Sequence, residues 1–229
     1  MKKFKFLFAM LVAVLFFSGT VFAEIDNDID DTDEDDIKKV LLTKKQKNIA
    51  IISSYTAIGN LEELKKAVKV GLTDGEMTVN EIKEVMTQLY AYCGFPRSLN
   101  ALNVLMDVSK NGAYMVGPEG KPLDKDANKN KIGTKKQTKL VGKKVKGDLY
   151  TFAPAIDAYL KEHLFADIFS RGILTDQERE VATIAALSIM EKVEPQLAAH
   201  IQIGKRTGLE QTQVDEILNI VENIKNNKL

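Results

Sequence analysis

The chain of 229 residues has little of what disulfide frameworks, metal sites and nucleic-acid interfaces require. Its single cysteine, Cys93, cannot form an intramolecular disulfide. Its two histidines, His163 and His200, have no neighbours at metal-ligand spacing, so we expect no metal site. The 32 basic and 32 acidic residues cancel, which argues against nucleic acid as the main partner. Little β-strand pattern occurs outside residues 116–150, which favours an all-α protein.

The first 23 residues have the three parts of a secretory signal peptide. A start containing Lys2, Lys3 and Lys5 precedes the apolar run "FLFAMLVAVLFF" and the small-residue stretch "SGTVFA". A membrane-spanning helix usually needs about 20 apolar residues, more than this run offers. We therefore expect cleavage after Ala23, export to the periplasm or beyond, and no membrane association afterwards. The mature chain would carry 29 basic and 32 acidic residues, a net charge of −3.

Residues 24–37 form an acidic segment, "EIDNDIDDTDEDDI", with nine acids between Glu24 and Asp36. Such a block of like charges repels itself and is typical of a disordered tail. It lacks the glycine and the spaced terminal glutamate of a calcium-binding loop.

The rest of the chain predicts helices separated by glycine and proline. Thr43 is expected to cap a first helix that ends at Gly59, and "LEELKKAVKVG" predicts a second helix that ends at Gly71. A third apolar stripe runs to Cys93, where "GFP" predicts a break and Pro96 opens the next helix. Helical spacing resumes at residue 152 and continues to the C-terminus.

The two ends of the chain resemble each other. Leu42-Thr43 matches Leu174-Thr175, "NIAIISSYTAI" matches "EVATIAALSIM", and "GLTDGEMTVNEIKEV" matches "GLEQTQVDEIL". We therefore predict a duplicated helical unit, with repeats in residues 38–115 and 151–229 that bury their apolar faces against each other.

Residues 116–150, between the repeats, predict a basic linker. Ten lysines lie between Lys121 and Lys146, and the segment contains five glycines. We expect a solvated connection with a short hairpin near "TKLVGKKV". Connections of this length are often functional, and pairing with the acidic tail is an alternative role.

Two motifs carry a resemblance to a known family. "LTDQEREVATIAALSIMEKVEPQLAAHIQIGKRTGL" resembles the core of carboxymuconolactone decarboxylases, in which an Arg-Glu pair opens one helix and a histidine lies on the next. "EVMTQLYAYCGFPRSLNAL" resembles that family's helix-Gly-Phe-Pro-helix segment. The resemblance implies the helical fold shared with alkylhydroperoxidase D, and assembly as a trimer or a multiple of trimers.

Alkylhydroperoxidase D-like relatives carry a Cys-x-x-Cys pair followed four residues later by histidine. In the register that ends at His200, the cysteine positions hold Val193 and Gln196, and neither can form a thiolate. A dithiol peroxidase cycle needs an attacking and a resolving sulfur, so this departure disfavours a redox role. Cys93 is then expected to pack as a small hydrophobe or to line a pocket.

The resemblance places candidate acid–base groups at His200 and Glu180. An imidazole can exchange protons with a substrate near neutral pH, although a histidine on an apolar face is also typical of a core residue. Glu180 lies in line with Ile184 and Leu187, at the edge of the buried face, where desolvation would suit it to proton relay. The alternative is complementation of the helix dipole.

Three further residues are candidates for binding a substrate. Arg97, directly after Pro96, could hold a carboxylate in bidentate fashion, or form a surface ion pair. His163 could be a second acid or base, or could lie on a helix surface. Cys93 lies beside Arg97 and could line the same pocket.

Three functions follow. The first is a decarboxylase-like enzyme that acts on a small carboxylated lactone without a cofactor, because the lactone carbonyl and double bond can accept the electrons as carbon dioxide leaves. The second is a thiol-dependent antioxidant that uses Cys93 with an external thiol. The third is a non-catalytic, oligomeric binding protein.

Overall fold

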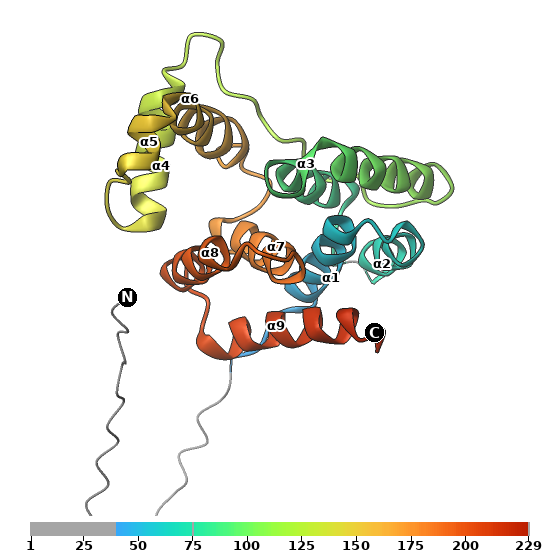
Figure 1. The fold of residues 1–229 in the computed structure, drawn as a ribbon. Helices are drawn as coiled ribbons and strands as arrows, with labels where there is room; N and C mark the ends of the chain where they lie inside the picture. Colours follow the sequence, from blue (N-terminus) through green and yellow to red (C-terminus); the bar gives the residue numbers. More distant parts are fainter. Residues whose placement is uncertain (1–39, 75, 229) are drawn as a thin grey trace, which may run out of the picture. The chain divides into compact units, whose positions relative to one another are not determined.

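The computed structural model describes residues 40–74 and 76–228, and these residues form helices and connecting loops without a β-strand (Figure 1). The expected signal peptide and acidic tail lie outside the described residues. The fold is therefore all-α, as predicted. In the described part, no helix is both long enough and apolar enough to cross a membrane.

Both repeats begin with the same helix cap. The Thr43 hydroxyl accepts a hydrogen bond from the Gln46 amide, and the Gln46 side chain accepts one from the Thr43 amide. Thr175 and Glu178 form the same reciprocal pair. Such capping boxes satisfy amides that the first helical turn leaves unpaired. The cap predicted at Thr43 and the helix end predicted at Gly59, which has a φ of 72°, are confirmed.

Three helices of the first repeat correspond to three of the second. In the first repeat they are α1 (Lys44–Ile58), α2 (Leu61–Thr73) and the first half of α3 (Val79–Lys110). Their counterparts in the second repeat are, in the same order, α7 (Asp176–Ile189), α8 (Glu194–Arg206) and α9 (Gln211–Lys225). Gly71 in α2 faces Ile52, and Gly204 in α8 faces Ile184. Ile52 and Ile184 are matched residues in the sequence repeat, so packing as well as sequence is duplicated.

The helix α3 bends at the predicted break. Gly94 has a φ of 80° and a ψ of 163°, outside the helical region, and favours a residue without a side chain. Pro96 follows at the start of the second half, where its missing amide costs no hydrogen bond.

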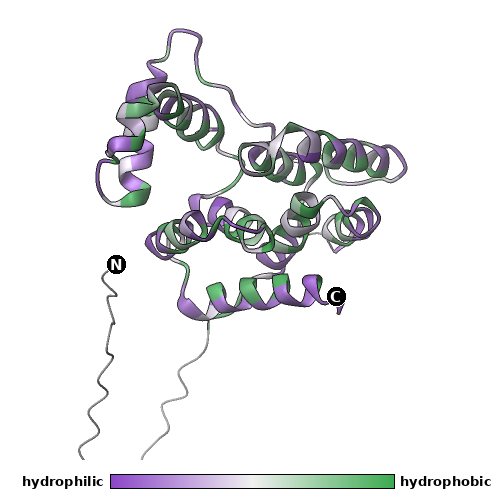
Figure 2. Cartoon of the chain, viewed as in Figure 1, coloured by the Kyte–Doolittle hydropathy of each residue, from purple (hydrophilic) through white to green (hydrophobic). Residues whose placement is uncertain are grey.

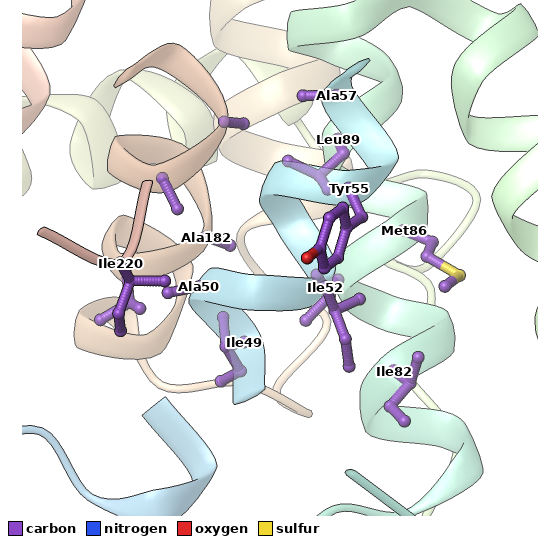
Figure 3. Close-up of a cluster of buried hydrophobic side chains, with 14 of the residues drawn as sticks. Ile49, Ala50, Ile52, Tyr55, Ala57, Ile82, Met86, Leu89, Ala182 and Ile220 are labelled. Atoms are coloured by element: carbon purple, nitrogen blue, oxygen red, sulfur yellow. The ribbon is translucent and has the colours of Figure 1, made fainter. Parts of the chain in front are cut away.

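The repeats meet in one apolar core. The helix α1 packs against α7 and α9, and α3 also packs against α7. Figure 3 shows Ala50 toward Ala182 and Ile220 and Ile52 toward Ile82 and Met86, all buried. The apolar side of α9 faces this core and its polar side faces outward (Figure 2). Truncating a buried isoleucine such as Ile52 to alanine would cost about 2–5 kcal/mol.

The prediction of a hairpin within the basic segment is wrong, because residues 129–141 form a helix. This helix, α4 (Lys129–Val141), buries Gly133, Gln137 and Leu140 along one face. A Cβ at Gly133 would lie 1.6 Å from the Lys161 carbonyl oxygen, so glycine permits close packing. The helix partner is η1 (Tyr159–Ile168), a π-helical segment reached through α5 (Asp148–Phe152) and α6 (Pro154–Ala158).

Candidate functional site

A buried carboxylate and a histidine meet between α7 and α8. Glu180 Oε2 lies 2.8 Å from His200 Nδ1. The Glu180 side chain is fully buried, whereas 13% of the His200 side chain is exposed. With Nδ1 directed at the carboxylate, Nε2 is left for another partner. Solvent therefore reaches this carboxylate–imidazole pair from the side of the histidine.

Gly204 allows α8 to approach α7 at this pair. It lies one turn after His200, and a Cβ there would come within 3.0 Å of Ile184 Cδ1 and 3.7 Å of Glu180 Cβ. A side chain at this position would crowd Ile184 and Leu209, so glycine suits the close approach of the two helices. Local sequence thus sets the spacing at which Glu180 and His200 can form a hydrogen bond.

A network of polar side chains lies beside the pair and ties it to the first repeat. Glu84 on α3 accepts hydrogen bonds from Arg179 Nη2 and Arg171 Nε, both at 2.9 Å. Gln88, one turn along α3, accepts from Arg179 and donates to the Thr183 hydroxyl. Buried charges are stable only when they are paired in this way.

Tyr92 is the next residue of the same α3 stripe, because positions 84, 88 and 92 are each one turn apart. Its ring meets the His200 imidazole edge-on, with centroids 5.5 Å apart and planes at 81°. The hydroxyl is buried and has no hydrogen-bond partner among the described residues. Burial raises the pKa of Tyr92, the Glu180 carboxylate raises it further, and Thr183 and Arg179 oppose the shift.

Sequence reasoning missed Tyr92, Glu84 and Gln88. The spacing of four residues between them was the available signal. It places three polar side chains on a single side of a helix that also supplies Met86 and Leu89 to the core. Their partners on α7 are about 90 residues away in sequence, so the pattern alone could not identify them.

Cys93 lies at the edge of the apolar core. Its thiol is 3.2 Å from the Leu89 carbonyl oxygen, to which it donates within the helix. Burial raises the pKa of the Cys93 thiol to about 11, so it is protonated at neutral pH. This is the environment of an unreactive, packed cysteine.

Arg97 and His163 have partners of their own. Arg97 donates to the Ile58 carbonyl at the end of α1, and His163 Nδ1 lies 3.1 Å from Asp167. No hydrogen bond or ring contact within residues 40–74 and 76–228 joins either side chain to the Glu180–His200 pair. The structure thus brings together Glu180 and His200, and adds Tyr92.

Four surface hollows of about 200–420 Å³ lie away from the pair and are lined by other residues. The described residues contain no group of three or more His, Cys, Asp or Glu side chains that could hold a metal ion. The contact of Glu180 with His200 is the arrangement used for proton transfer through an imidazole that a buried carboxylate orients.

The first repeat has no equivalent of this pair. The matched segments align Glu180 with Asn48, and the paired glycines Gly71 and Gly204 align His200 with Ala67. Neither Asn48 nor Ala67 can act as an acid or base. The duplicated fold thus contains a single Glu–His pair at these positions, to which the first repeat contributes Tyr92.

Comparison with known families matches the chain to the model of the carboxymuconolactone decarboxylase family over residues 23–107 and 154–224. The segment between the two matches contains α4 and α5. No curated protein matches the chain.

Proposed function

Because the chain belongs to the carboxymuconolactone decarboxylase family, we propose that the Glu180–His200 pair catalyses decarboxylation or proton transfer on a small carboxylated, lactone-type substrate. The observation that carries the proposal is the 2.8 Å contact between a fully buried carboxylate and a partly exposed imidazole. A histidine held in this way has one nitrogen fixed and the other free to exchange a proton.

The reaction needs no partner beyond substrate and water. When the bond to the substrate carboxylate breaks, carbon dioxide leaves and the electron pair moves into the enolate of the lactone carbonyl. His200 then delivers a proton from Nε2 to the carbon of this enolate next to the carbonyl, and takes up a proton from solvent. Glu180 holds the imidazole in place through the hydrogen bond to Nδ1.

The pKa of about 11 for Cys93 makes a thiol peroxidase less consistent with the site. At neutral pH only about one thiol in ten thousand would be ionised, and the thiolate is the reactive form. The positions expected to hold a cysteine pair carry Val193 and Gln196.

The signal-peptide pattern supports action outside the cytoplasm. The reaction that gives the family its name belongs to aromatic catabolism, which is normally cytoplasmic, so the natural substrate of this protein would differ from the family's namesake. The substrate class is therefore argued from chemistry: a lactone with a carboxylate on a saturated carbon that is joined to the lactone carbonyl directly or through the ring double bond.

The test is a panel of carboxylated five-membered unsaturated lactones, with carbon dioxide release as the readout. Glu180→Gln and His200→Gln should each lower the rate by about 10²–10⁴-fold, the usual contribution of acid–base groups. His163→Gln is the matched control, since His163 also pairs with a carboxylate but has a side chain that is 49% exposed. Equal rates in all three variants would refute the assignment, and binding without turnover would favour a binding protein.

A further inference from the structure

Two buried polar atoms beside His200 have no hydrogen-bond partner among the described residues. They are the Tyr92 hydroxyl and Glu180 Oε1. A buried polar atom left in this state costs about 1–3 kcal/mol, so native structures rarely keep one without a reason. Two of them at a single histidine indicate that a polar guest belongs there.

The two atoms differ in what they can bind. A carboxylate oxygen only accepts hydrogen bonds, whereas a phenol can donate one. The raised pKa of Tyr92 keeps its proton in place at neutral pH, so Tyr92 offers a donor. Glu180 Oε1 would repel a second carboxylate. A guest oxygen that accepts a hydrogen bond is therefore expected at Tyr92 rather than at Glu180 Oε1.

Thr183 is the competing acceptor for the Tyr92 hydroxyl. Its own hydroxyl already donates to the Arg179 carbonyl at 2.9 Å and accepts from Gln88 at 2.9 Å. One lone pair remains, and Thr183 lies close enough to the Tyr92 hydroxyl to act against the rise in the pKa of Tyr92 as a hydrogen-bond partner, although the contact does not have the geometry of a full hydrogen bond. A guest oxygen at Tyr92 would replace this weak contact with a well-formed hydrogen bond.

We propose that Tyr92 is a further catalytic residue, whose hydroxyl donates a hydrogen bond to the carbonyl oxygen of an enolisable lactone. This inference rests on the proposed function and specifies its substrate as a molecule that forms an enolate. Negative charge collects on the carbonyl oxygen as carbon dioxide leaves, and a buried donor at that oxygen stabilises the charge. His200, edge-on to the Tyr92 ring, protonates the neighbouring carbon.

The single site per chain then has parts from both repeats. The second repeat provides the acid–base pair, and the first provides the oxygen-binding donor from α3. This division explains why the first repeat can dispense with its own pair at Asn48 and Ala67 without losing a role in the chemistry.

The inference is tested by binding, which does not require the natural substrate. Tetronic acid, a five-membered lactone that is an enolate at neutral pH, serves as the probe, and γ-butyrolactone is its uncharged counterpart. Titration calorimetry on the wild-type protein should show preference for the enolate. Tyr92→Phe should weaken enolate binding about 10–100-fold, as expected for a hydrogen bond to a charged oxygen, and leave γ-butyrolactone almost unaffected.

Tyr90→Phe is the matched control, because Tyr90 lies two residues earlier on α3 and stacks on Phe95. It should bind both lactones as the wild type does. Tyr92→Phe keeps the ring and removes a hydroxyl without a partner, so its melting temperature should be unchanged or higher. This measurement separates loss of binding from loss of fold.

The outcomes distinguish this inference from the proposed function. Enolate binding that depends on Tyr92, in a protein that turns over no lactone, supports the oxygen site and refutes decarboxylation. Turnover that depends on His200 but not on Tyr92 refutes the oxygen site alone. Failure of the wild type to prefer tetronic acid over γ-butyrolactone also overturns it.

Discussion

Substituting alanine for the two matched glycines, Gly204 and Gly71, tests whether close helix packing builds the Glu180–His200 pair. A Cβ at Gly204 would lie 2.9 Å from Leu209 Cδ1 and 3.0 Å from Ile184 Cδ1. Both distances are shorter than ordinary contacts between carbon atoms, about 3.5–4.0 Å. Both neighbours are terminal methyl groups of buried side chains, so Leu209 and Ile184 have to shift to make room for the new Cβ.

The magnitude follows from two opposing effects. Replacing glycine by alanine inside a helix stabilises the fold by about 0.4–1 kcal/mol, and overpacking a core costs about 1–3 kcal/mol. Gly204→Ala should therefore be destabilised by about 0–2 kcal/mol, the difference of the two terms. At Gly71 the nearest atoms are 3.5 Å away, an ordinary contact, so only the favourable effect applies.

Urea unfolding at neutral pH and fixed protein concentration measures the difference. Gly71→Ala should gain about 0.4–1 kcal/mol, leaving the two variants about 1–3 kcal/mol apart. Lactone turnover by Gly204→Ala then reports whether the shift at Ile184 reaches the neighbouring Glu180–His200 pair. Equal stabilisation of both variants would refute the argument that glycine sets the α7–α8 spacing.

Three other predictions concern the fold and its surface. Glu84→Gln should cost about 3–5 kcal/mol in urea unfolding, since it leaves buried Arg179 without its counterion, and a loss below 1 kcal/mol would contradict the network. Burial acts to raise the pKa of Asp176, but ion pairs with Lys136 and Lys139 lower it overall. A carboxyl with a lowered pKa stabilises the fold at pH values above the pKa that it has in the unfolded chain, about 4. The free energy of unfolding should therefore fall as the pH drops below about 4, and it should fall less in Asp176→Asn. The chain is expected to form a trimer or a multiple of trimers by light scattering, and Phe152→Glu, at a side chain that is 88% exposed, should shift it toward monomer if that apolar surface is an interface.

Much of the fold could be predicted from local signals. Thr43 marks the start of the first helix, Gly59 marks its end, and Gly94 marks the bend in α3. Each is set by the chemistry of a single residue with its near neighbours, which sequence displays directly. The repeat followed from matched segments.

The parts that were missed depend on distant partners. The helix α4 is rich in lysine, and its buried residues, Gly133, Gln137 and Leu140, include only one large apolar side chain. The sequence therefore shows no apolar stripe, and these residues are buried because α4 packs on η1. Tyr92 could not be identified from sequence because its contact is with His200, which lies on another helix far along the chain. Glu180 and His200 were identified by resemblance, but their contact across two helices required the structure.

The central claim is that an imidazole oriented by a buried carboxylate transfers the proton in this protein. Its most direct test compares carbon dioxide release by wild type, His200→Gln and His163→Gln on the same carboxylated unsaturated lactone. We predict that only His200→Gln is impaired, by at least about 10²-fold. Wild-type rates in His200→Gln, or equal losses in both variants, would contradict the claim.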